Sequence, residues 1–352
     1  MKRRFLPVVL VAISSAAWAI NPPDDPALKF VDHLPAYAPK EAVSGVIRLW
    51  GHGSPKHDFM GTLVNAWIEG FRKYQPDVSF ENHMYGTASS VGALYTGAGD
   101  IALMGEEMSP TALQAFIREK HYAPTGVEIA TGSLDVNYFD YCHMVFVQKD
   151  NPLTGITLQQ LDGIYGAEHR RGSKNLRTWG DLGLTGEWAT RPIHPSGWQT
   201  DVDFGLFFRE AVLEGSHRWS PAVKEFNHVV RPDGTLYESG QQMVDLLAAD
   251  PAGIVISNLR YKNAGVKALP VARAPGGAFY AATRENLISQ KYPLTRIIPA
   301  YFDQPPGKPV EPKVREFIRY LLSREGQEAL VHQSDYLPLG EGFVHEQLEK
   351  LR

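Results

Sequence analysis

The apolar positions in the first third of the chain change from strand-like to helix-like spacing. Residues 46–50 form a short run rich in β-branched side chains. The apolar residues that follow recur at helical spacing: Met60, Leu63, Val64, Trp67, Ile68 and Phe71. Because strands have a period of two and helices a period of about 3.6 residues, this section predicts a strand, a loop and a helix.

The same alternation continues along the chain. Residues 78–83 alternate as a second strand, a short helix is predicted over 90–96, and 101–104 form a third strand. A further helix is predicted to begin at Pro110, with Ser109 as its N-cap. Strands that alternate with helices predict an α/β fold built on a parallel, doubly wound sheet.

The second half of the chain carries both kinds of pattern again. Strands are predicted at 144–147, 253–256 and 297–301, and helices at 158–165, 203–213, 241–248, 314–322 and from 325 onward. A long polar, glycine-rich stretch occupies 166–197. The elements between about 134 and 255 predict a second α/β lobe.

Two glycine- and serine-rich loops each lie between a predicted strand and a predicted helix. They are Gly51-His52-Gly53-Ser54 and Gly86-Thr87-Ala88-Ser89-Ser90. Such a junction aims backbone N–H groups and the positive end of a helix dipole at one point, which suits a small anionic or polar ligand. We expect the two loops to face each other across one pocket. Either loop alone also fits ordinary turn and N-cap chemistry.

The N-terminus has the pattern of a secretory signal. Lys2, Arg3 and Arg4 precede an apolar run over 5–13, and Ala17-Trp18-Ala19 fits a cleavage site. The Arg3-Arg4 pair leaves twin-arginine export open as an alternative to the general secretory route. Removal of residues 1–19 leaves 333 of the 352 residues, enough for two domain cores. Residues 20–44 are rich in proline and are expected to form a leader arm.

Charge and cysteine content exclude several classes of protein. Loss of the three basic residues at the N-terminus takes the formal net charge from −4 to −7, which gives no basic field for nucleic acid. Cys142 is the only cysteine, so the chain has neither an internal disulfide nor a lipid-anchored cysteine at the cleavage site. No later apolar run reaches the roughly 20 residues that span a bilayer. These features predict a soluble protein of the periplasm.

Short motifs follow one another in a distinctive order. They are Gly99-Asp100-Ile101-Ala102, Asn151-Pro152, Leu158-Gln159-Gln160-Leu161, Thr178-Trp179-Gly180-Asp181-Leu182-Gly183, Asp250-Pro251-Ala252-Gly253-Ile254, Tyr292-Pro293-Leu294-Thr295-Arg296, Leu322-Ser323-Arg324-Glu325-Gly326-Gln327 and Tyr336-Leu337-Pro338-Leu339. In order and spacing they resemble the periplasmic phosphate-binding proteins of the PstS type. The resemblance covers roughly residues 46–340.

This resemblance implies a type II periplasmic binding protein fold, with two α/β lobes joined by two crossovers and a ligand cleft between them. The first lobe would combine 45–133 with 258–352, and the second would be 134–257. The implied function is capture of phosphate or a related small oxyanion for an ABC transporter. The implied partner is an inner-membrane permease, and the binding protein itself is expected to be a monomer without a cofactor.

The resemblance also implies a set of ligand-binding residues. The residues carried over by position are Gly53, Ser54, Lys56, Thr87, Ser89, Ser90, Asp100, Ser196 and Gly197. Among them, Lys56 would supply positive charge. Backbone N–H groups and hydroxyls would hold the oxyanion, and Asp100 would accept a proton from it.

The chain departs from the family pattern at the arginine that usually binds the dianion. Only Arg191 lies close before Ser196-Gly197, and that pair is not followed by a threonine. A bidentate arginine is the usual partner of a dianion. Glu106 and Glu107 follow the third strand. Carboxylates near the cleft raise the free-energy cost of binding a dianion.

These departures keep an alternative open. A sensor or accessory binding protein of the same fold would take a less charged ligand, with Trp50, Tyr85 and Trp198 as flat apolar surface for a ring.

Enzyme and metal chemistry are not expected. The chain has no nucleophile elbow and no Walker loop, and the adjacent side chains of Glu106 and Glu107 point in different directions on regular backbone. His52, His57 and Asp58 are of the residue types that bind zinc, but their spacing matches no metal site.

Overall fold

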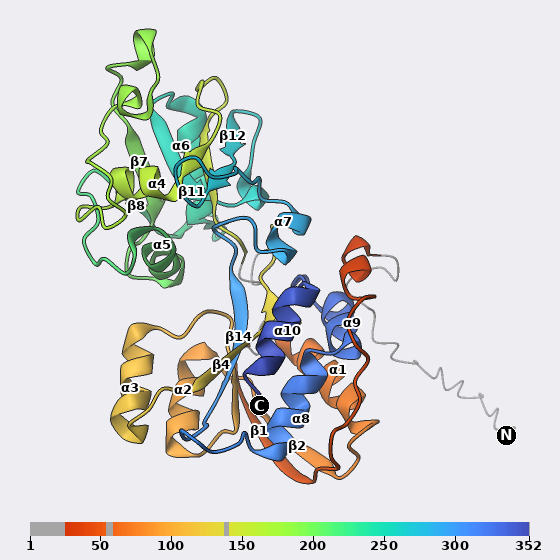
Figure 1. Ribbon diagram of the computed structural model, residues 1–352. Coiled ribbons are helices and arrows are strands. Elements are labelled where there is room, and N and C mark those ends of the chain that lie inside the picture. The colour runs from red at the N-terminus through yellow and green to blue at the C-terminus, as the bar shows by residue number, and fades with distance from the viewer. Residues whose placement is uncertain (1–24, 54–58, 137–140, 352) are drawn as a thin grey trace, which may run out of the picture.

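The computed structural model describes residues 25–53, 59–136 and 141–351, and it consists of two α/β lobes (Figure 1). The predicted signal peptide lies outside the described residues. The same holds for Ser54, Lys56 and the other residues of the 54–58 segment.

The first lobe is built on a five-stranded sheet. In the order of the sheet, its strands are β2 (Val78–His83), β1 (Gly45–Gly51), β3 (Ile101–Leu103), β14 (Ile297–Phe302) and β4 (Thr125–Thr131). β1 pairs in parallel with β2 and β3, whereas β14 pairs antiparallel with β3 and β4. The sheet is therefore mixed rather than wholly parallel, because the last strand of the lobe arrives from the other lobe in the opposite direction.

Helices cover both faces of this sheet. On one face α2 (Thr87–Thr96) packs on α3 (Pro110–Lys120), and on the other α1 (Phe59–Arg72) packs with α8 (Pro312–Leu321) and α9 (Arg324–Gln333) (Figure 1). The lobe also contains α7 (Arg284–Ile288) and α10 (Glu341–Glu349). The helical spacing in α1 is confirmed: Met60, Leu63, Val64, Trp67 and Phe71 are all fully buried.

The second lobe has its own five-stranded sheet. Its order is β12 (Val266–Leu269), β5 (Met144–Gln148), β11 (Gly253–Ser257), β7 (His194–Trp198) and β8 (Lys224–Phe226). β11, β7 and β8 are parallel to one another, β5 pairs antiparallel with β11, and β12 pairs antiparallel with β5. This sheet is mixed as well.

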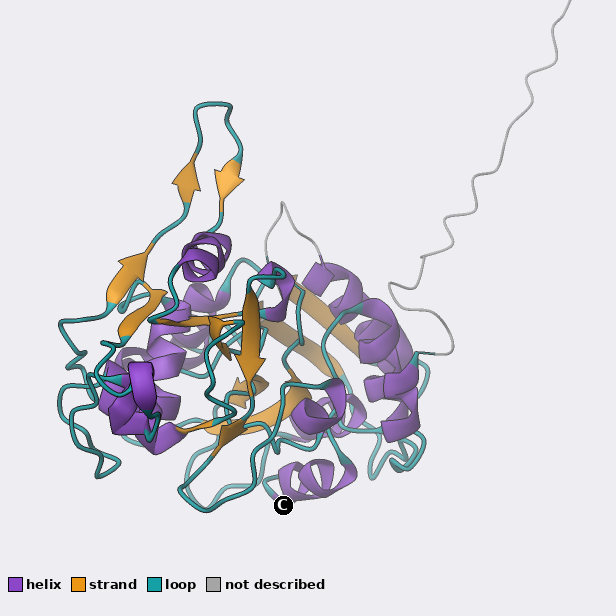
Figure 2. Ribbon diagram, turned by 90° about the horizontal axis from the view of Figure 1, so that it is seen from above, coloured by secondary structure: helices purple, strands orange, loops and turns teal. Residues whose placement is uncertain are grey.

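Helices and smaller elements complete the second lobe. The helices are α4 (Leu158–Tyr165), α5 (Asp203–Leu213) and α6 (Ser239–Ala249), with 3-10 turns η2 (Trp179–Leu182), η3 (Gly186–Trp188) and η4 (Leu259–Tyr261). Two small sheets pair β6 (Ile156–Thr157) with β13 (Val271–Ala272), and β9 (Val229–Val230) with β10 (Leu236–Tyr237). The β9–β10 hairpin projects from the body of the lobe (Figure 2).

The boundary of the lobes differs from the one expected at residue 257. β12 pairs with β5 of the second sheet and β13 pairs with β6, so the second lobe extends past 257. The chain rejoins the first sheet only at β14. Residues 266–269, Val-Lys-Ala-Leu, carry too few β-branched side chains to be recognised as a strand from the sequence.

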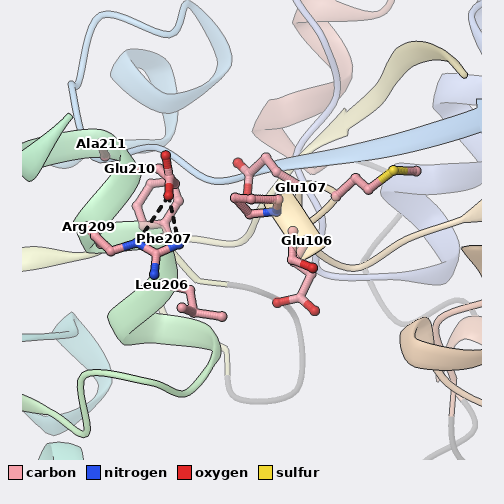
Figure 3. Close-up of a pocket in the computed structure, with 10 residues that line it drawn as sticks. Glu106, Glu107, Leu206, Phe207, Arg209, Glu210 and Ala211 are labelled. Atoms are coloured by element: carbon pink, nitrogen blue, oxygen red, sulfur yellow. Dashed lines mark hydrogen bonds and ion pairs between the residues drawn. The ribbon is translucent and has the colours of Figure 1, made fainter. Parts of the chain in front are cut away.

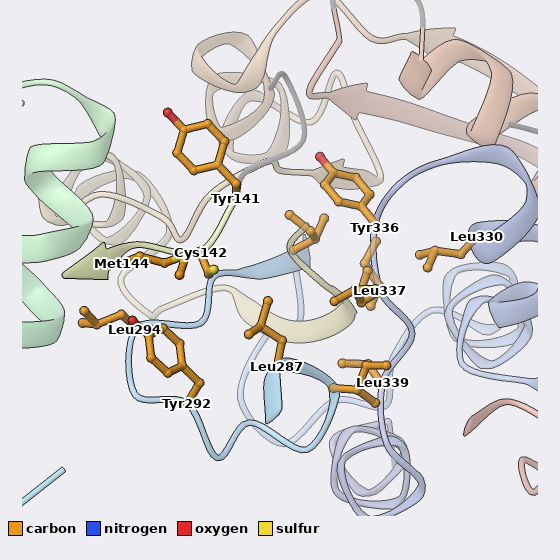
Figure 4. Packing of buried hydrophobic residues seen from close by; sticks show 14 of the residues in the cluster. Tyr141, Cys142, Met144, Leu287, Tyr292, Leu294, Leu330, Tyr336, Leu337 and Leu339 are labelled. Atoms are coloured by element: carbon orange, nitrogen blue, oxygen red, sulfur yellow. The ribbon is translucent and has the colours of Figure 1, made fainter. Parts of the chain in front are cut away.

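The two crossovers meet at a shared apolar core between the lobes. Cys142 on the first crossover and Leu294 on the second belong to one buried cluster, which also includes Leu337 of the C-terminal segment (Figure 4). The crossovers are also joined by backbone hydrogen bonds, from Gly132 N–H to the Arg296 carbonyl and from His143 N–H to the Leu294 carbonyl. This junction fixes where the two lobes approach each other.

The described part of the leader arm packs on the first lobe. It contains η1 (Pro26–Phe30) and the buried Leu34 and Tyr37. The Tyr37 hydroxyl donates to the buried carboxylate of Glu316, at 2.8 Å, and Arg324 N–H donates to the Pro35 carbonyl. Within the described residues, no helix combines the length and apolar character needed to cross a membrane.

Candidate functional site

The N-terminus of α2 forms one wall of the candidate site. We predicted a helix from residue 90, but α2 begins at Thr87, directly after Gly86. Gly86 has a φ of 122°, a conformation that favours glycine, and it has no side chain with which to cap the helix. The first-turn N–H groups of α2 and its dipole therefore point toward the end of β2 and the neighbouring loop.

The two predicted loops lie against each other and are joined by a backbone hydrogen bond. Gly86 N–H donates to the Gly51 carbonyl at 2.8 Å. A Cβ at Gly53 would come within 2.8 Å of the Met84 carbonyl oxygen, so glycine permits this close approach. The Thr87 hydroxyl lies 3.4 Å from Nδ1 of His52. Gly53, His52 and Thr87 thus converge at the carboxyl ends of β1 and β2.

Ser89 and Ser90 are placed differently from the expectation. Both lie in the first turn of α2, where the Ser89 hydroxyl donates to the Gly86 carbonyl and the Ser90 hydroxyl to the Thr87 carbonyl, at 2.8 and 2.7 Å. Ser90 is fully buried, whereas Ser89 is half-buried. Because their hydroxyl hydrogens bond the carbonyls of Gly86 and Thr87, neither hydroxyl hydrogen is directed to a ligand.

Asp100 lies at the amino end of the short strand β3, whereas these loops follow the carboxyl ends of β1 and β2. It precedes β3, and its N–H bonds the carbonyl of Arg48 in the middle of β1. Its carboxylate accepts from the Arg48 guanidinium at 2.7 Å and lies 3.9 Å from Nζ of Lys313. Burial alone raises the pKa of Asp100, but the hydrogen bonds from Arg48 and the charge of Lys313 outweigh it and lower that pKa. The structure does not bring Asp100 to the two glycine- and serine-rich loops.

Ser196 and Gly197 also differ from the expectation. They lie inside β7, not in a loop, and both are buried. The loop that reaches the cleft side follows Trp198 and leads into α5, whose N-cap residue is the apolar Val202. The glycine-rich character of the preceding stretch concealed this strand.

Arg296 lies in the cleft between the lobes. The sequence motifs contain this arginine but did not mark it as a cleft residue. It is fully buried and directly precedes β14, at the second crossover. Its Nε lies 3.9 Å from the carboxylate of Glu107, and its guanidinium lies over the rings of Phe204 and Phe207 of α5. A charged residue immediately before an apolar strand is the one sequence signal that pointed to it.

A cavity of about 280 Å³ lies between the lobes (Figure 3). We call it the interlobe cavity; its lining residues are Glu106, Glu107, Met108, Ser109, Pro110, Leu206, Phe207, Arg209, Glu210 and Ala211. The first five follow β3 in the first lobe, and the others lie on α5 of the second. Glu106 and Glu107 face Leu206 and Phe207 across it (Figure 3).

Three aromatic residues were suggested as a surface for a ring ligand. Two of them, Trp198 and Trp50, pack against other side chains of the protein. Trp198 is buried against His143 and Phe204, with ring centroids 4.6 and 4.9 Å away. Trp50 lies beside His83 at 4.7 Å, and Tyr85 is exposed. No group of three or more His, Cys, Asp or Glu side chains in the described ranges is arranged to hold a metal ion.

Comparison with known proteins identifies the relatives of the chain. The model of the PBP superfamily domain matches residues 58–325. The phosphate-binding protein PstS of Pseudomonas aeruginosa is 31% identical over 100% of this chain and 99% of its own length. Protein SphX of Synechococcus elongatus is 23% identical over 79% of this chain and 74% of its own.

Among solved structures, PstS from Borrelia burgdorferi superposes with a TM-score of 0.53 at 14% identity. The match covers 84% of this chain and 99% of that one, and it supports the two-lobe fold.

Proposed function

This chain belongs to the PBP superfamily, and on that premise we propose that it is a periplasmic solute-binding protein that captures phosphate for an ABC transporter. The observation that carries the proposal is the convergence of the α2 N-terminus, Thr87 and His52 at the carboxyl ends of β1 and β2. Helix N-termini bind phosphate through their N–H groups and their dipole.

We place the ligand against the first turn of α2, at the edge of the space between the lobes. Gly53, Thr87 and the backbone N–H groups of α2 would contact its oxygens. The Ser89 N–H and hydroxyl both bond the Gly86 carbonyl, so Ser89 is structural in this arrangement, as are Ser90, Asp100, Ser196 and Gly197. Ser54 and Lys56 belong to the same loop as Gly53 and remain predictions, since they lie outside the described residues.

The proposed binding site is tested by isothermal titration of the mature protein with inorganic phosphate at neutral pH, after removal of co-purified ligand by unfolding and refolding. One-to-one binding that the α2 variant Thr87→Ala weakens is the expected result. An equal affinity of Thr87→Ala and wild type would refute the site, and absence of phosphate binding would refute the function. If phosphate does not bind, a sensor or accessory binding protein with a less charged ligand becomes the candidate function.

The transport role is a separate part of the proposal. A binding protein delivers ligand by closing its lobes, which presents a surface to an inner-membrane permease. A strain that lacks its own phosphate-binding protein should regain phosphate uptake only when this chain is exported with its cognate permease. Size-exclusion chromatography with light scattering tests the expected monomer.

A further inference from the structure

The charged side chains that line the interlobe cavity are engaged within the protein. A carboxylate oxygen of Glu107 lies 3.9 Å from Nε of the buried Arg296. The Glu210 carboxylate accepts two hydrogen bonds from the Arg209 guanidinium, at 2.9 and 3.1 Å. Glu106 also interacts within the protein. The charges of the lining are therefore already committed to other side chains, and they do not select a charged ligand.

The other lining residues present apolar side chains, apart from one serine. The apolar residues are Met108 and Pro110 of the first lobe and Leu206, Phe207 and Ala211 of α5. The hydroxyl oxygen of Ser109 accepts from Ala112 N–H at the start of α3, so it is used as a helix cap. Removal of such a surface from water is favourable in proportion to the apolar area that is covered. The lining therefore favours an uncharged apolar group.

The size of the cavity limits what it can hold. Its volume is about 280 Å³. An apolar protein cavity of about 150 Å³ is large enough to bind benzene, so the interlobe cavity has room for a group of about six carbon atoms. A phosphate ion inside it would lose its hydration against apolar walls, which is costly. The cavity itself is therefore unsuited to the anion.

The cavity adjoins the proposed phosphate site through consecutive residues. A Cβ at Gly105 would come within 2.6 Å of Nδ1 of His52, and the next residue, Glu106, lines the cavity. The same ring nitrogen lies 3.4 Å from the Thr87 hydroxyl at the start of α2. A ligand whose phosphate lies at α2 can therefore extend a substituent past His52 into the cavity.

A ligand with an anionic end and an apolar end matches both parts of the cleft. We propose that the cleft binds a phosphomonoester with a small, uncharged apolar substituent, its phosphate at the N-terminus of α2 and its substituent in the interlobe cavity. This inference rests on the proposed function and narrows its substrate class. Because Met108 of the first lobe and Phe207 of the second both line the cavity, the substituent favours the closed arrangement of the lobes.

Titration of the wild-type mature protein with four probes tests the inference. The probes are inorganic phosphate, methyl phosphate, phenyl phosphate and phenol. The two esters carry the same charged group and differ in the apolar substituent. We expect phenyl phosphate to bind at least tenfold more tightly than methyl phosphate, and phenol alone to bind too weakly to detect.

The outcomes separate this inference from the proposed function. If inorganic phosphate binds and phenyl phosphate is no tighter than methyl phosphate, the apolar subsite is wrong and the phosphate-binding function stands. If phenol binds as tightly as phenyl phosphate, the linkage to a phosphate is wrong. If none of the three phosphate compounds binds, the inference fails together with the proposed function.

Two variants of α5 connect the effect to the cavity. Ala211→Leu fills the cavity, and Leu206→Asn makes its wall polar at nearly constant side-chain size. Each should lower the affinity for phenyl phosphate by about tenfold and leave the affinity for methyl phosphate within twofold. The matched controls are Ala249→Leu and Leu246→Asn, at exposed positions of α6 outside the lining, and they should change neither affinity.

Thermal unfolding of each variant checks that it is folded. An equal loss of affinity for both esters in a folded Ala211→Leu protein would contradict the assignment of the cavity to the apolar substituent.

Discussion

Nε of Arg296 lies 3.9 Å from a carboxylate oxygen of Glu107, although Arg296 is fully buried and the Glu107 side chain is 39% exposed. The guanidinium carbon also lies 4.8 Å from the ring centre of Phe207. Arg296 belongs to the second crossover, Glu107 to the first lobe and Phe207 to α5 of the second lobe. One buried cation therefore contacts both sides of the interlobe space.

Replacement of this arginine should destabilise the protein. Arg296→Gln removes the ion pair with Glu107 and the stacking on Phe207, so we expect a loss of about 2 kcal/mol in the free energy of unfolding. Arg296→Lys keeps the charge but loses the planar contact, and it should recover about half of that loss. Urea denaturation followed by fluorescence measures both.

Arg191 provides a matched control for this experiment. It also stacks on an aromatic ring, that of Trp188 at 4.0 Å, and pairs with Glu187 at 3.6 Å, but at the surface. Arg191→Gln should cost only about 0.5 kcal/mol. A similar cost at both positions would mean that burial of Arg296 contributes nothing.

Arg296 also shows where inference from the sequence ended. It stood inside a motif that marked the family, yet its partners come from distant parts of the chain, and no local pattern states that they meet. Periodicity finds which side chains of one element face inward. It does not find which charge is buried between two lobes.

The hydroxyl of Thr87 should contribute to binding, whereas that of Ser90 should not. A hydrogen bond to a charged ligand contributes about 1.5 kcal/mol or more, so Thr87→Ala should weaken phosphate binding by roughly tenfold. Ser90→Ala removes a bond to the Thr87 carbonyl inside the lobe and should lower stability by about 1 kcal/mol with little change in affinity. Calorimetric titration of the two variants separates the roles, and the reverse order of effects would contradict the assignment.

The start of α2 explains why the different roles of the Thr87 and Ser90 hydroxyls could not be predicted from the sequence. The first turn of the helix contains Thr87 and Ser89, whose hydroxyl side chains are typical of caps and turns. The helix begins at Thr87, directly after Gly86 and three residues before the start predicted at residue 90. Likewise, Ser196 and Gly197 lie in a strand because β11 and β8 pair with β7 on both sides, and tertiary pairing overrides weak strand propensity.

Other parts of the fold were predictable because their signals are local. The helix over 158–165 has its predicted bounds, and Thr157 and Gln160 form a capping box at its start. α5 also has its predicted bounds, 203–213. In contrast, β14 lies antiparallel between β3 and β4 because the chain returns to the first lobe from the second. This arrangement depends on the topology of the whole chain, and no short segment predicts it.

Asp100 should support stability rather than binding. Asp100→Asn weakens the contacts with Arg48 and Lys313, so we expect a loss of about 1–2 kcal/mol at pH 7 and unchanged phosphate affinity. The folded pKa of Asp100 lies below the value of about 3.9 in the unfolded chain. The stabilisation is therefore complete above about pH 4 and is lost as the pH falls through the folded pKa.

Denaturation of wild type and Asp100→Asn over a pH series measures this effect. The difference between their free energies of unfolding should be constant near neutral pH and should shrink below about pH 4. A difference that persists unchanged at low pH would show that the carboxylate charge is not its source. Reduced phosphate affinity in Asp100→Asn would restore Asp100 to the binding site.

Cys142 offers a probe of how often the junction between the lobes opens. The thiol is fully buried among apolar residues of both crossovers, and burial raises its pKa (Figure 4). A buried, protonated thiol is unreactive, so we expect no reaction of the native protein with a disulfide reagent at pH 8 and one thiol per chain after unfolding in guanidinium chloride. Rapid labelling without denaturant would show that the junction is open in solution.

Phosphate should slow this labelling wherever the reaction requires unfolding of the junction. A ligand that binds only the folded protein, at a concentration 100 times its Kd, stabilises it by about 2.7 kcal/mol. In the regime where labelling follows the population of the open form, the rate in partly denaturing urea should then fall by roughly 100-fold. Thr87→Ala should require a proportionally higher phosphate concentration for the same protection, because its Kd is higher. Protection of wild type by phosphate together with no such shift in Thr87→Ala would place the ligand elsewhere than at α2.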